Sequence, residues 1–246
     1  LADHVGQSES TAASLRTFLC AGAPIPGPLV ERAKAALGAT IVSAWGMSEN
    51  GAVTTTLLDD HPDRAAQTDG CPLPGTAVRV VDASGADLPT GAPGRLLVRS
   101  CSNFGGYLKR PHLNATDADG WFDTGDLARL DDDGYIRITG RSKDVIIRGG
   151  ENIPVVEVEA LLYQHPAVAQ VAIVAYPDDR LGERACAVIT LKPGAELGFD
   201  DMVAYLADQQ LAKNYLPERL LVVDEMPTTP SGKIQKFKLR DRVGEA

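Results

Sequence analysis

Residues 15–44, LRTFLCAGAPIPGPLVERAKAALGATIVSA, carry the clearest indication of the fold class of this chain. The apolar run at 15–20 predicts a short buried strand, and Pro28 fits the first turn of a helix that Gly38 ends. Residues 40–44 predict a second short strand. The order strand, helix, strand is typical of an α/β layer, so we expect a mixed α/β fold.

The pattern changes after this first part of the chain. Short apolar runs, separated by turn signals rich in Gly, Asp and Pro, predict strands at 77–81, 95–99 and 135–139. Residues 126–139 are typical of a hairpin with Asp133-Gly134 at its tip. We therefore expect an α/β piece over residues 1–65 and a small β-barrel-like subdomain over residues 66–142, with a curled sheet as the alternative to a barrel.

The last hundred or so residues indicate a compact α+β domain. A helix is predicted at 154–164, where His165-Pro166 ends it. Asp200 can cap a second helix, with apolar residues at helical spacing at Val203, Leu206 and Leu211. Apolar runs predict strands at 168–175, 185–191 and 220–223.

Composition excludes several classes of protein. The net charge of −9 argues against a nucleic-acid binder that relies on its overall charge. The apolar runs are far shorter than the ~20 residues of a membrane span, and the first residues lack the features of a signal peptide. The 4 cysteines show no C-x-x-C spacing and the 4 histidines are scattered, so we expect reduced thiols in a cytoplasmic protein and no zinc site.

Two short segments combine residue types that suit nucleotide chemistry. In residues 45–49 (WGMSE), the aromatic ring can stack on a base, the hydroxyl can contact a phosphate and the carboxylate can bind Mg²⁺; a capped turn is the alternative. In residues 121–126 (WFDTGD), a Thr-Gly turn precedes Asp126. That carboxylate can accept both hydroxyls of a ribose, or it can stabilise its own turn.

Two further segments carry cations beside glycines. Residues 140–144 (GRSKD) and 148–152 (RGGEN) suit a hinge followed by a close approach of the backbone to a ligand, a solvated interdomain loop being the alternative. Residues 227–233 (PTTPSGK) place Lys233 on a loop framed by Pro and Gly. Such a lysine can present its charge to a phosphate, although exposed lysines are common.

In this order, the four segments closely resemble the C-terminal half of the AMP-forming acyl-CoA synthetases. These enzymes share the adenylate-forming superfamily with peptide-synthetase adenylation domains and luciferases. The family's motifs are an aromatic-Gly-x-(Ser/Thr)-Glu run, Thr-Gly-Asp, the hinge Gly-Arg-x-(Lys/Asp) and Pro-x-Thr-x-x-Gly-Lys, matched by residues 45–49, 124–126, 140–143 and 227–233. The resemblance implies that residues 1–142 end the large domain and that residues 143–246 form the small mobile domain.

The resemblance also implies a nucleotide site. Trp45 and residues 22–24 would enclose the adenine, Asp126 and Arg141 would hold the ribose, and Glu49 would bind Mg²⁺. The complete set implied for ATP and AMP is Gly22, Ala23, Pro24, Trp45, Gly46, Met47, Ser48, Asp126, Ile138 and Arg141.

Two half-reactions are implied in turn. A carboxylic acid and ATP give acyl-AMP and pyrophosphate, and coenzyme A then gives the thioester and AMP. Lys233 would bridge the acid and the α-phosphate in the first step. Rotation at Lys143 would then withdraw it and bring Arg148, Gly149 and Gly150 to the CoA channel. The oligomeric state is left open.

Gly46 bears on which acid is used. In the family a bulky residue at this position closes the acyl slot, so glycine implies a medium-chain, alicyclic or aromatic acid; Met47 can line the same slot or belong to the core.

The family's Ser/Thr/Gly-rich phosphate loop is absent, so we expect a truncated and inactive piece of a longer ligase. The alternatives are an adenylation domain that loads a carrier protein and a non-catalytic nucleotide-binding fragment. The chain ends 13 residues after Lys233 without a carrier domain, which favours the ligase.

Overall fold

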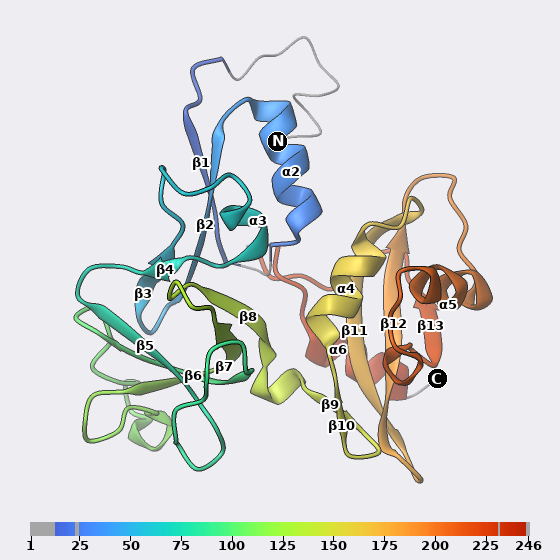
Figure 1. Ribbon diagram of the computed structural model, residues 1–246. Helices are drawn as coiled ribbons and strands as arrows, with labels where there is room; N and C mark the ends of the chain where they lie inside the picture. Colours follow the sequence, from blue (N-terminus) through green and yellow to red (C-terminus); the bar gives the residue numbers. More distant parts are fainter. Residues whose placement is uncertain (1–12, 23–24, 231, 245–246) are drawn as a thin grey trace. The chain divides into compact units, whose positions relative to one another are not determined.

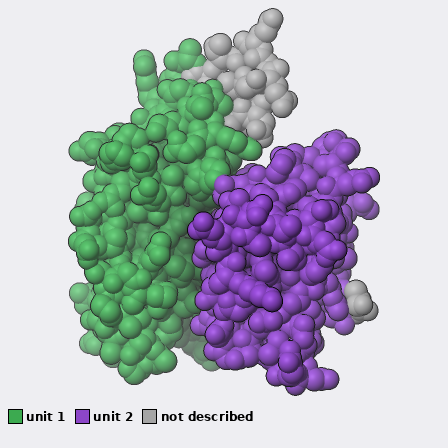
Figure 2. Space-filling view, turned by 45° about the vertical axis from the view of Figure 1, so that its right-hand side comes forward, with its two compact units in different colours: residues 1–142 green, residues 143–246 purple. Residues whose placement is uncertain are grey.

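The chain forms two compact units, residues 1–142 (unit 1) and 143–246 (unit 2), coloured separately in Figure 2. The computed structural model describes residues 13–22, 25–230 and 232–244. Ala23 and Pro24, expected at the adenine site, lie outside the described residues. The expected mixed α/β fold is confirmed: helices and three sheets are distributed over the two units.

Unit 1 begins with a four-stranded sheet in the order β1-β2-β3-β4 (Figure 1). Its strands are β1 (Thr17–Cys20), β2 (Thr40–Met47), β3 (Gly51–Thr55) and β4 (Cys71–Pro72). β1 and β2 are parallel and are connected by α2 (Gly27–Leu37). Gly38 ends this helix with φ 61°, donating its N–H to the carbonyl oxygen of Lys34, so the predicted helix end is confirmed.

The second strand is longer than the sequence predicts. β2 continues through Trp45 to Met47, and a tight turn then leads into β3, which pairs antiparallel with it. Asn50 closes this turn because its buried side chain accepts the N–H of Met47 at 3.1 Å. Residues 45–49 therefore span the end of a strand and the turn of a hairpin. A short helix, α3 (Arg64–Gln67), follows β3.

The second sheet of unit 1 is antiparallel, in the order β5-β6-β7-β8. Its strands are β5 (Thr76–Val81), β6 (Gly94–Ser100), β7 (Phe122–Leu130) and β8 (Ile136–Arg141), with a short 3₁₀ turn, η1 (Pro111–Leu113), before β7. The predicted β7–β8 hairpin is confirmed. Of the two forms expected, the closed barrel is wrong and the open sheet is found, because β5 and β8 do not pair with each other in the part of the chain described.

Packing explains why this sheet stays open. Four strands are too few to close into a filled barrel. The sheet instead buries one face with Val53 of β3, in a core that also contains Val80, Leu96, Val98, Ala128 and Ile136.

Unit 2 is built on a five-stranded sheet, ordered β10-β9-β12-β11, with β13 pairing parallel to β12. The strands are β9 (Ile146–Arg148), β10 (Glu151–Ile153), β11 (Val168–Asp178), β12 (Gly182–Leu191) and β13 (Arg219–Val222). A 3₁₀ turn, η2 (Ser142–Asp144), precedes β9, and another, η3 (Lys213–Tyr215), precedes β13.

Both faces of the long central strands are buried. Ile173 and Ala187 face a core shared with α4 (Val155–Tyr163) and α5 (Phe199–Asp208). Their chain neighbours Val174 and Cys186 face a second core, shared with α6 (Lys236–Gly244). Side chains alternate along a strand, so a strand covered on both sides reads as a continuous apolar run. This explains why these strands were predictable from sequence.

The helices of unit 2 follow the prediction in part. α4 lies within the predicted range 154–164. The predicted cap at Asp200 is wrong, because α5 starts at Phe199 after Gly198. Asp200 lies in the first turn, where a carboxylate still favours the helix dipole. Among the described residues, none of the helices is both long and apolar enough to cross a membrane.

Candidate nucleotide-binding site

Asp126 of β7 is the centre of a side-chain cluster in unit 1. Its Oδ1 accepts a hydrogen bond from Nε of Arg141 at 2.8 Å, and its Oδ2 accepts one from Nε1 of Trp45 at 3.1 Å. The residue is only 8% exposed. Three residues from three separate predicted motifs therefore meet at one carboxylate.

The sheet fixes this carboxylate through its backbone. Asp126 lies opposite Arg141 in the β7–β8 register, which brings the two side chains together. The hydroxyl of Thr124 accepts the N–H of Asp126 at 3.1 Å and donates to the carbonyl of Leu96 at 2.8 Å. The predicted Thr-Gly turn is wrong, because Thr124 and Gly125 lie inside β7, where Gly125 has φ 69°.

The cluster leaves Asp126 able to accept more bonds. An ionised carboxylate has about four lone-pair sites. Arg141 and Trp45 each use one of them, on different oxygens. Each oxygen can therefore still accept a hydroxyl, which suits a vicinal diol such as that of ribose.

Ile138, expected beside the adenine, is held by a carboxylate that sequence reasoning missed. Its N–H donates to Oδ2 of Asp69 at 2.8 Å, and a guanidinium nitrogen of Arg137 lies 3.7 Å from the same oxygen. Asp69 is buried, and this burial raises the pKa of its carboxyl. Asp69 thus ties β8, the strand that carries Ile138 and Arg141, to the segment before β4.

Glu49, the expected Mg²⁺ ligand, lies half-buried in the turn after β2. Its Oε1 accepts the hydroxyl of Tyr107 at 2.7 Å, a bond that raises the pKa of Tyr107. Sequence reasoning missed Tyr107. Among the described residues, Oε2 of Glu49 accepts no hydrogen bond, and no three His, Cys, Asp or Glu side chains gather as a metal cage. A single carboxylate fits Mg²⁺, which commonly takes one or two carboxylates together with substrate phosphates.

Gly46 has a structural requirement of its own. A Cβ at this position would lie 1.9 Å from the carbonyl oxygen of Gly51, across the β2–β3 hairpin. Glycine is therefore needed for the close approach of two backbones, whichever acid is bound. Its role in acid size stays a prediction. Ser48 is exposed, Met47 is half-buried, and Gly22 lies in a bend with φ 92°.

Lys233 lies in unit 2 on an exposed, tightly closed loop. Thr229 donates its N–H to the carbonyl of Lys233 at 2.8 Å, and its hydroxyl accepts the N–H of Lys233 at 3.1 Å. An isolated bridge pairs Thr228 with Ile234 at the base of the loop. The ammonium group is thus carried by a small, locally bonded turn.

The residues expected at the CoA channel form a hairpin turn. Gly149 and Gly150, with φ 61° and 90°, are the two residues between β9 and β10. Two-residue hairpin loops require such positive φ values, so the turn alone accounts for both glycines. Arg148 forms an ion pair with Glu218, which sequence reasoning missed. The CoA role stays a prediction.

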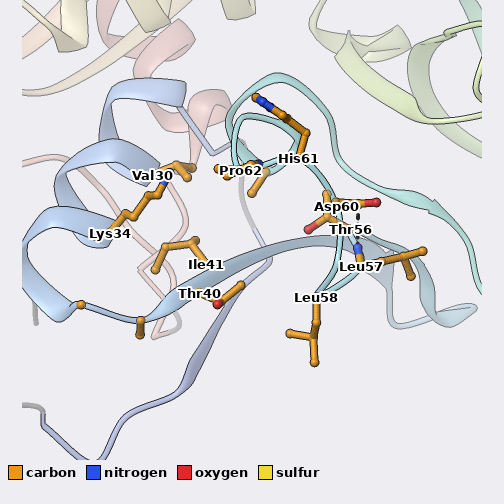
Figure 3. A pocket seen from close by; sticks show the side chains of 13 residues that line it. Val30, Lys34, Thr40, Ile41, Thr56, Leu57, Leu58, Asp60, His61 and Pro62 are labelled. Carbon is orange, nitrogen blue, oxygen red and sulfur yellow. Dashed lines mark hydrogen bonds between the residues drawn. The ribbon is translucent and has the colours of Figure 1, made fainter.

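A hollow of about 410 Å³ lies elsewhere in unit 1 (Figure 3). It is lined by Val30 and Lys34 of α2, by Thr40 and Ile41, and by the loop that follows β3. Thr40 and Ile41 lie at the start of β2, whereas Trp45 and Met47 lie at its end. Ligands of parallel sheets bind at the carboxyl ends of the strands, so the hollow is not part of the candidate site.

Two family models and several known proteins match this chain. The model of the AMP-binding enzyme family matches residues 1–108, and that of the AMP-binding enzyme C-terminal domain matches residues 157–233. The chain is 42% identical over 230 residues to the medium-chain fatty-acid–CoA ligase of Escherichia coli (strain K12), covering 92% of this chain and 40% of the ligase. This chain belongs to the AMP-binding enzymes.

Other AMP-binding enzymes are similarly related. The salicylyl-CoA synthase / salicylate adenylyltransferase of a Streptomyces species is 43% identical over 233 residues, with 94% of this chain and 42% of that protein covered. The solved structure of the amide bond synthetase McbA from Marinactinospora thermotolerans superposes with a TM-score of 0.90 at 34% identity, over 99% of this chain and 50% of that one. The chain spans about half the length of the relatives it matches.

Proposed function

We propose that this chain is the C-terminal part of an enzyme that activates a carboxylic acid with ATP and passes the acyl group to coenzyme A. The observation that carries the proposal is the cluster of Trp45, Asp126 and Arg141, in which three motifs meet at one buried carboxylate. Membership of the AMP-binding enzymes supports it.

Nucleotide binding follows from the acceptor capacity of Asp126. Its two oxygens accept the 2′- and 3′-hydroxyls of the ribose, while Arg141 keeps the carboxylate oriented. The hydrogen bond from Trp45 to Asp126 fixes the indole, which offers a ring face to the adenine. Ile138 contributes an apolar contact from β8, which Asp69 holds in place.

Glu49 would hold Mg²⁺ together with the phosphates. The ion would offset negative charge on the phosphate oxygens. Tyr107 binds one carboxylate oxygen of Glu49, so the carboxylate is oriented by the protein itself.

Lys233 serves the first half-reaction. A carboxylate oxygen of the acid attacks the α-phosphorus of ATP, and the bond to pyrophosphate breaks. The ammonium group contacts both the acid and the α-phosphate, where negative charge accumulates. In the second half-reaction the CoA thiolate attacks the acyl carbon and AMP leaves. Arg148, Gly149 and Gly150 line the CoA channel after rotation at Lys143.

The test uses the longer protein that carries this chain. Lys233→Ala should slow acyl-AMP formation about 10²–10³-fold, the loss typical of one donor to a developing charge. Thioester formation from supplied acyl-AMP should change little. Lys238→Ala removes an exposed lysine of the following helix and is the matched control. Equal losses in both half-reactions would argue against this role of Lys233.

The acid is proposed to be medium-chain, alicyclic or aromatic. Gly46 leaves the acyl slot without a side chain at that position, and relatives named for medium-chain fatty acids and for salicylate support the range. A panel of acids from acetate to octanoate, benzoate and cyclohexanecarboxylate, compared by acid-dependent ATP–pyrophosphate exchange, tests this. Preference for acetate would contradict it.

A carrier protein is the second candidate acceptor. One similar enzyme is named as an amide bond synthetase, for a product other than a CoA thioester, so similar sequences occur in enzymes named for different products. Single-turnover transfer from acyl-AMP to CoA and to a phosphopantetheinylated carrier protein distinguishes the two.

A further inference from the structure

The segment at the unit boundary is bound on both sides of a single residue. Before Lys143, the hydroxyl of Ser142 donates to the carbonyl of Gly125 at 2.9 Å, within unit 1. After Lys143, the carboxylate of Asp144 forms an ion pair with Arg240, within unit 2. The Asp144 side chain is 17% exposed. A rotation between the units would therefore concentrate its backbone change at Lys143.

Arg240 lies on the helix that directly follows the Lys233 loop. α6 begins at Lys236, three residues after Lys233. Residues four apart share one face of a helix, so Lys236 and Arg240 point the same way. Lys236 Nζ lies 2.6 Å from Oε1 of Glu159 in α4. That oxygen also accepts the N–H of Ile173 at 2.7 Å.

The same broad face of α6 is packed against the sheet, because residues three and four apart on a helix are neighbours. Leu239 and Val243 are buried in the core that contains Met226. This face of the helix is thus held by apolar contacts and by the two ion pairs beside them. Of these pairs, the one at Arg240 reaches the hinge segment; Nη2 of Arg240 also lies 3.5 Å from the carbonyl oxygen of Lys143.

We propose that Arg240 is a positioning residue, which joins the hinge segment to α6 so that the Lys233 loop moves with the hinge as one body. This inference rests on the proposed function. Lys233 is connected to the hinge through α6, whereas Arg148 follows the hinge directly along the main chain of β9. Loss of the Arg240 contact should therefore impair acyl-AMP formation more than thioester formation.

The experiment compares Arg240→Gln with Arg242→Gln in the longer protein. Arg242 is exposed on the same helix, so the control makes the same charge change. Arg240→Gln should slow acyl-AMP formation about tenfold or more, since small misplacements of a reacting group cost up to about a hundredfold. Thioester formation from supplied acyl-AMP should stay within about threefold. Arg240→Lys should restore part of the lost rate.

Hydrogen exchange gives a readout that is independent of activity. The backbone amides of residues 143–146 should exchange faster in Arg240→Gln than in the parent. In Arg242→Gln their exchange rates should match those of the parent. Asp144→Asn removes the other partner and should reproduce both effects, which covers the case in which Arg240→Gln folds poorly. If Arg240→Gln and Asp144→Asn both behave like Arg242→Gln, the positioning role is wrong. If Lys233→Ala itself spares acyl-AMP formation, the proposed function fails instead.

Discussion

The Asp126 cluster and the Lys233 loop are built on opposite principles. Asp126 is buried and bonded to side chains from two other strands, more than ten residues away in sequence. Lys233 is exposed, and the bonds that shape its loop join residues no more than eight apart. The cluster is therefore fixed by the fold of unit 1, whereas the loop keeps its shape locally and depends on α6 for its position. Affinity for nucleotide and rate of chemistry should respond to different substitutions.

The sharpest way to break this contrast is Asp126→Asn. The amide cannot accept on both atoms, so either Arg141 or Trp45 faces a donor, and the guanidinium loses its counter-charge. We expect ATP to bind about 100-fold more weakly, or about 2.7 kcal/mol. Equilibrium binding by the longer protein measures this. Asp123→Asn, on the same strand but paired with Arg95, should bind normally. Similar losses in both variants would contradict the assignment.

A second substitution affects the stability of the β2–β3 hairpin rather than the binding of nucleotide. Gly46→Ala places a Cβ 1.9 Å from the carbonyl oxygen of Gly51, so the two strands must separate. We expect unit 1 to lose about 2–4 kcal/mol, in the range of severe steric changes. Both tryptophans, Trp45 and Trp121, lie in unit 1, so their fluorescence in urea titrations reports this unit. Gly105→Ala, with open space around its Cβ, is the control and should stay near the parent.

A third prediction concerns the carboxyl that holds β8. Because burial raises the pKa of Asp69, the folded protein binds a proton there more tightly than the unfolded chain does. Its contribution to stability is full below the unfolded pKa of about 3.9 and is lost as the pH rises through the folded pKa. Asp69→Asn lacks this titration. Its free energy of unfolding should therefore rise relative to the parent between about pH 4 and about pH 7.

Urea titrations at the two pH values measure the difference in free energy of unfolding between Asp69→Asn and the parent. Asp59→Asn removes an exposed carboxyl and is the control variant. A difference for Asp69→Asn that falls with pH would show that Arg137 and the N–H of Ile138 outweigh burial.

The smallest expected effect is a difference in thiol reactivity between the two units. Burial raises the pKa of the Cys186 thiol to about 11, in the core of unit 2, whereas Cys101 of unit 1 is exposed. At pH 8, iodoacetamide should label Cys101 and spare Cys186 until unit 2 opens. Mass spectrometry of each site gives the two rates. Equal rates would mean that unit 2 opens readily.

Local patterns predicted much of the fold. Pro28 and Gly38 bound α2, and the apolar runs of β11 and β12 mark strands covered on both faces. The β2–β3 hairpin was missed, although Asn50-Gly51 is a common hairpin dipeptide. The barrel was wrong because a run of short strands does not reveal how many pair.

The candidate site was predictable only where motifs carry it. Asp69, Tyr107 and Glu218 bond to partners tens of residues away in the sequence, so no local pattern predicts these contacts. Their partners Ile138, Glu49 and Arg148 were expected. The sequence thus indicated the residues that we propose to face a ligand and missed the side chains that hold them in place.

The hydrogen bond of Ser142 and the ion pair of Asp144 show what the peptide bonds at Lys143 contribute to the protein. Ser142 is bonded inside unit 1 and Asp144 inside unit 2, so cutting the chain at Lys143 would break neither bond. The peptide link then acts chiefly by keeping the units at high effective concentration, of millimolar order for short connections. Two separately produced polypeptides should accordingly complement each other only near such concentrations, and a short flexible linker inserted at this position should be tolerated far better than a cut.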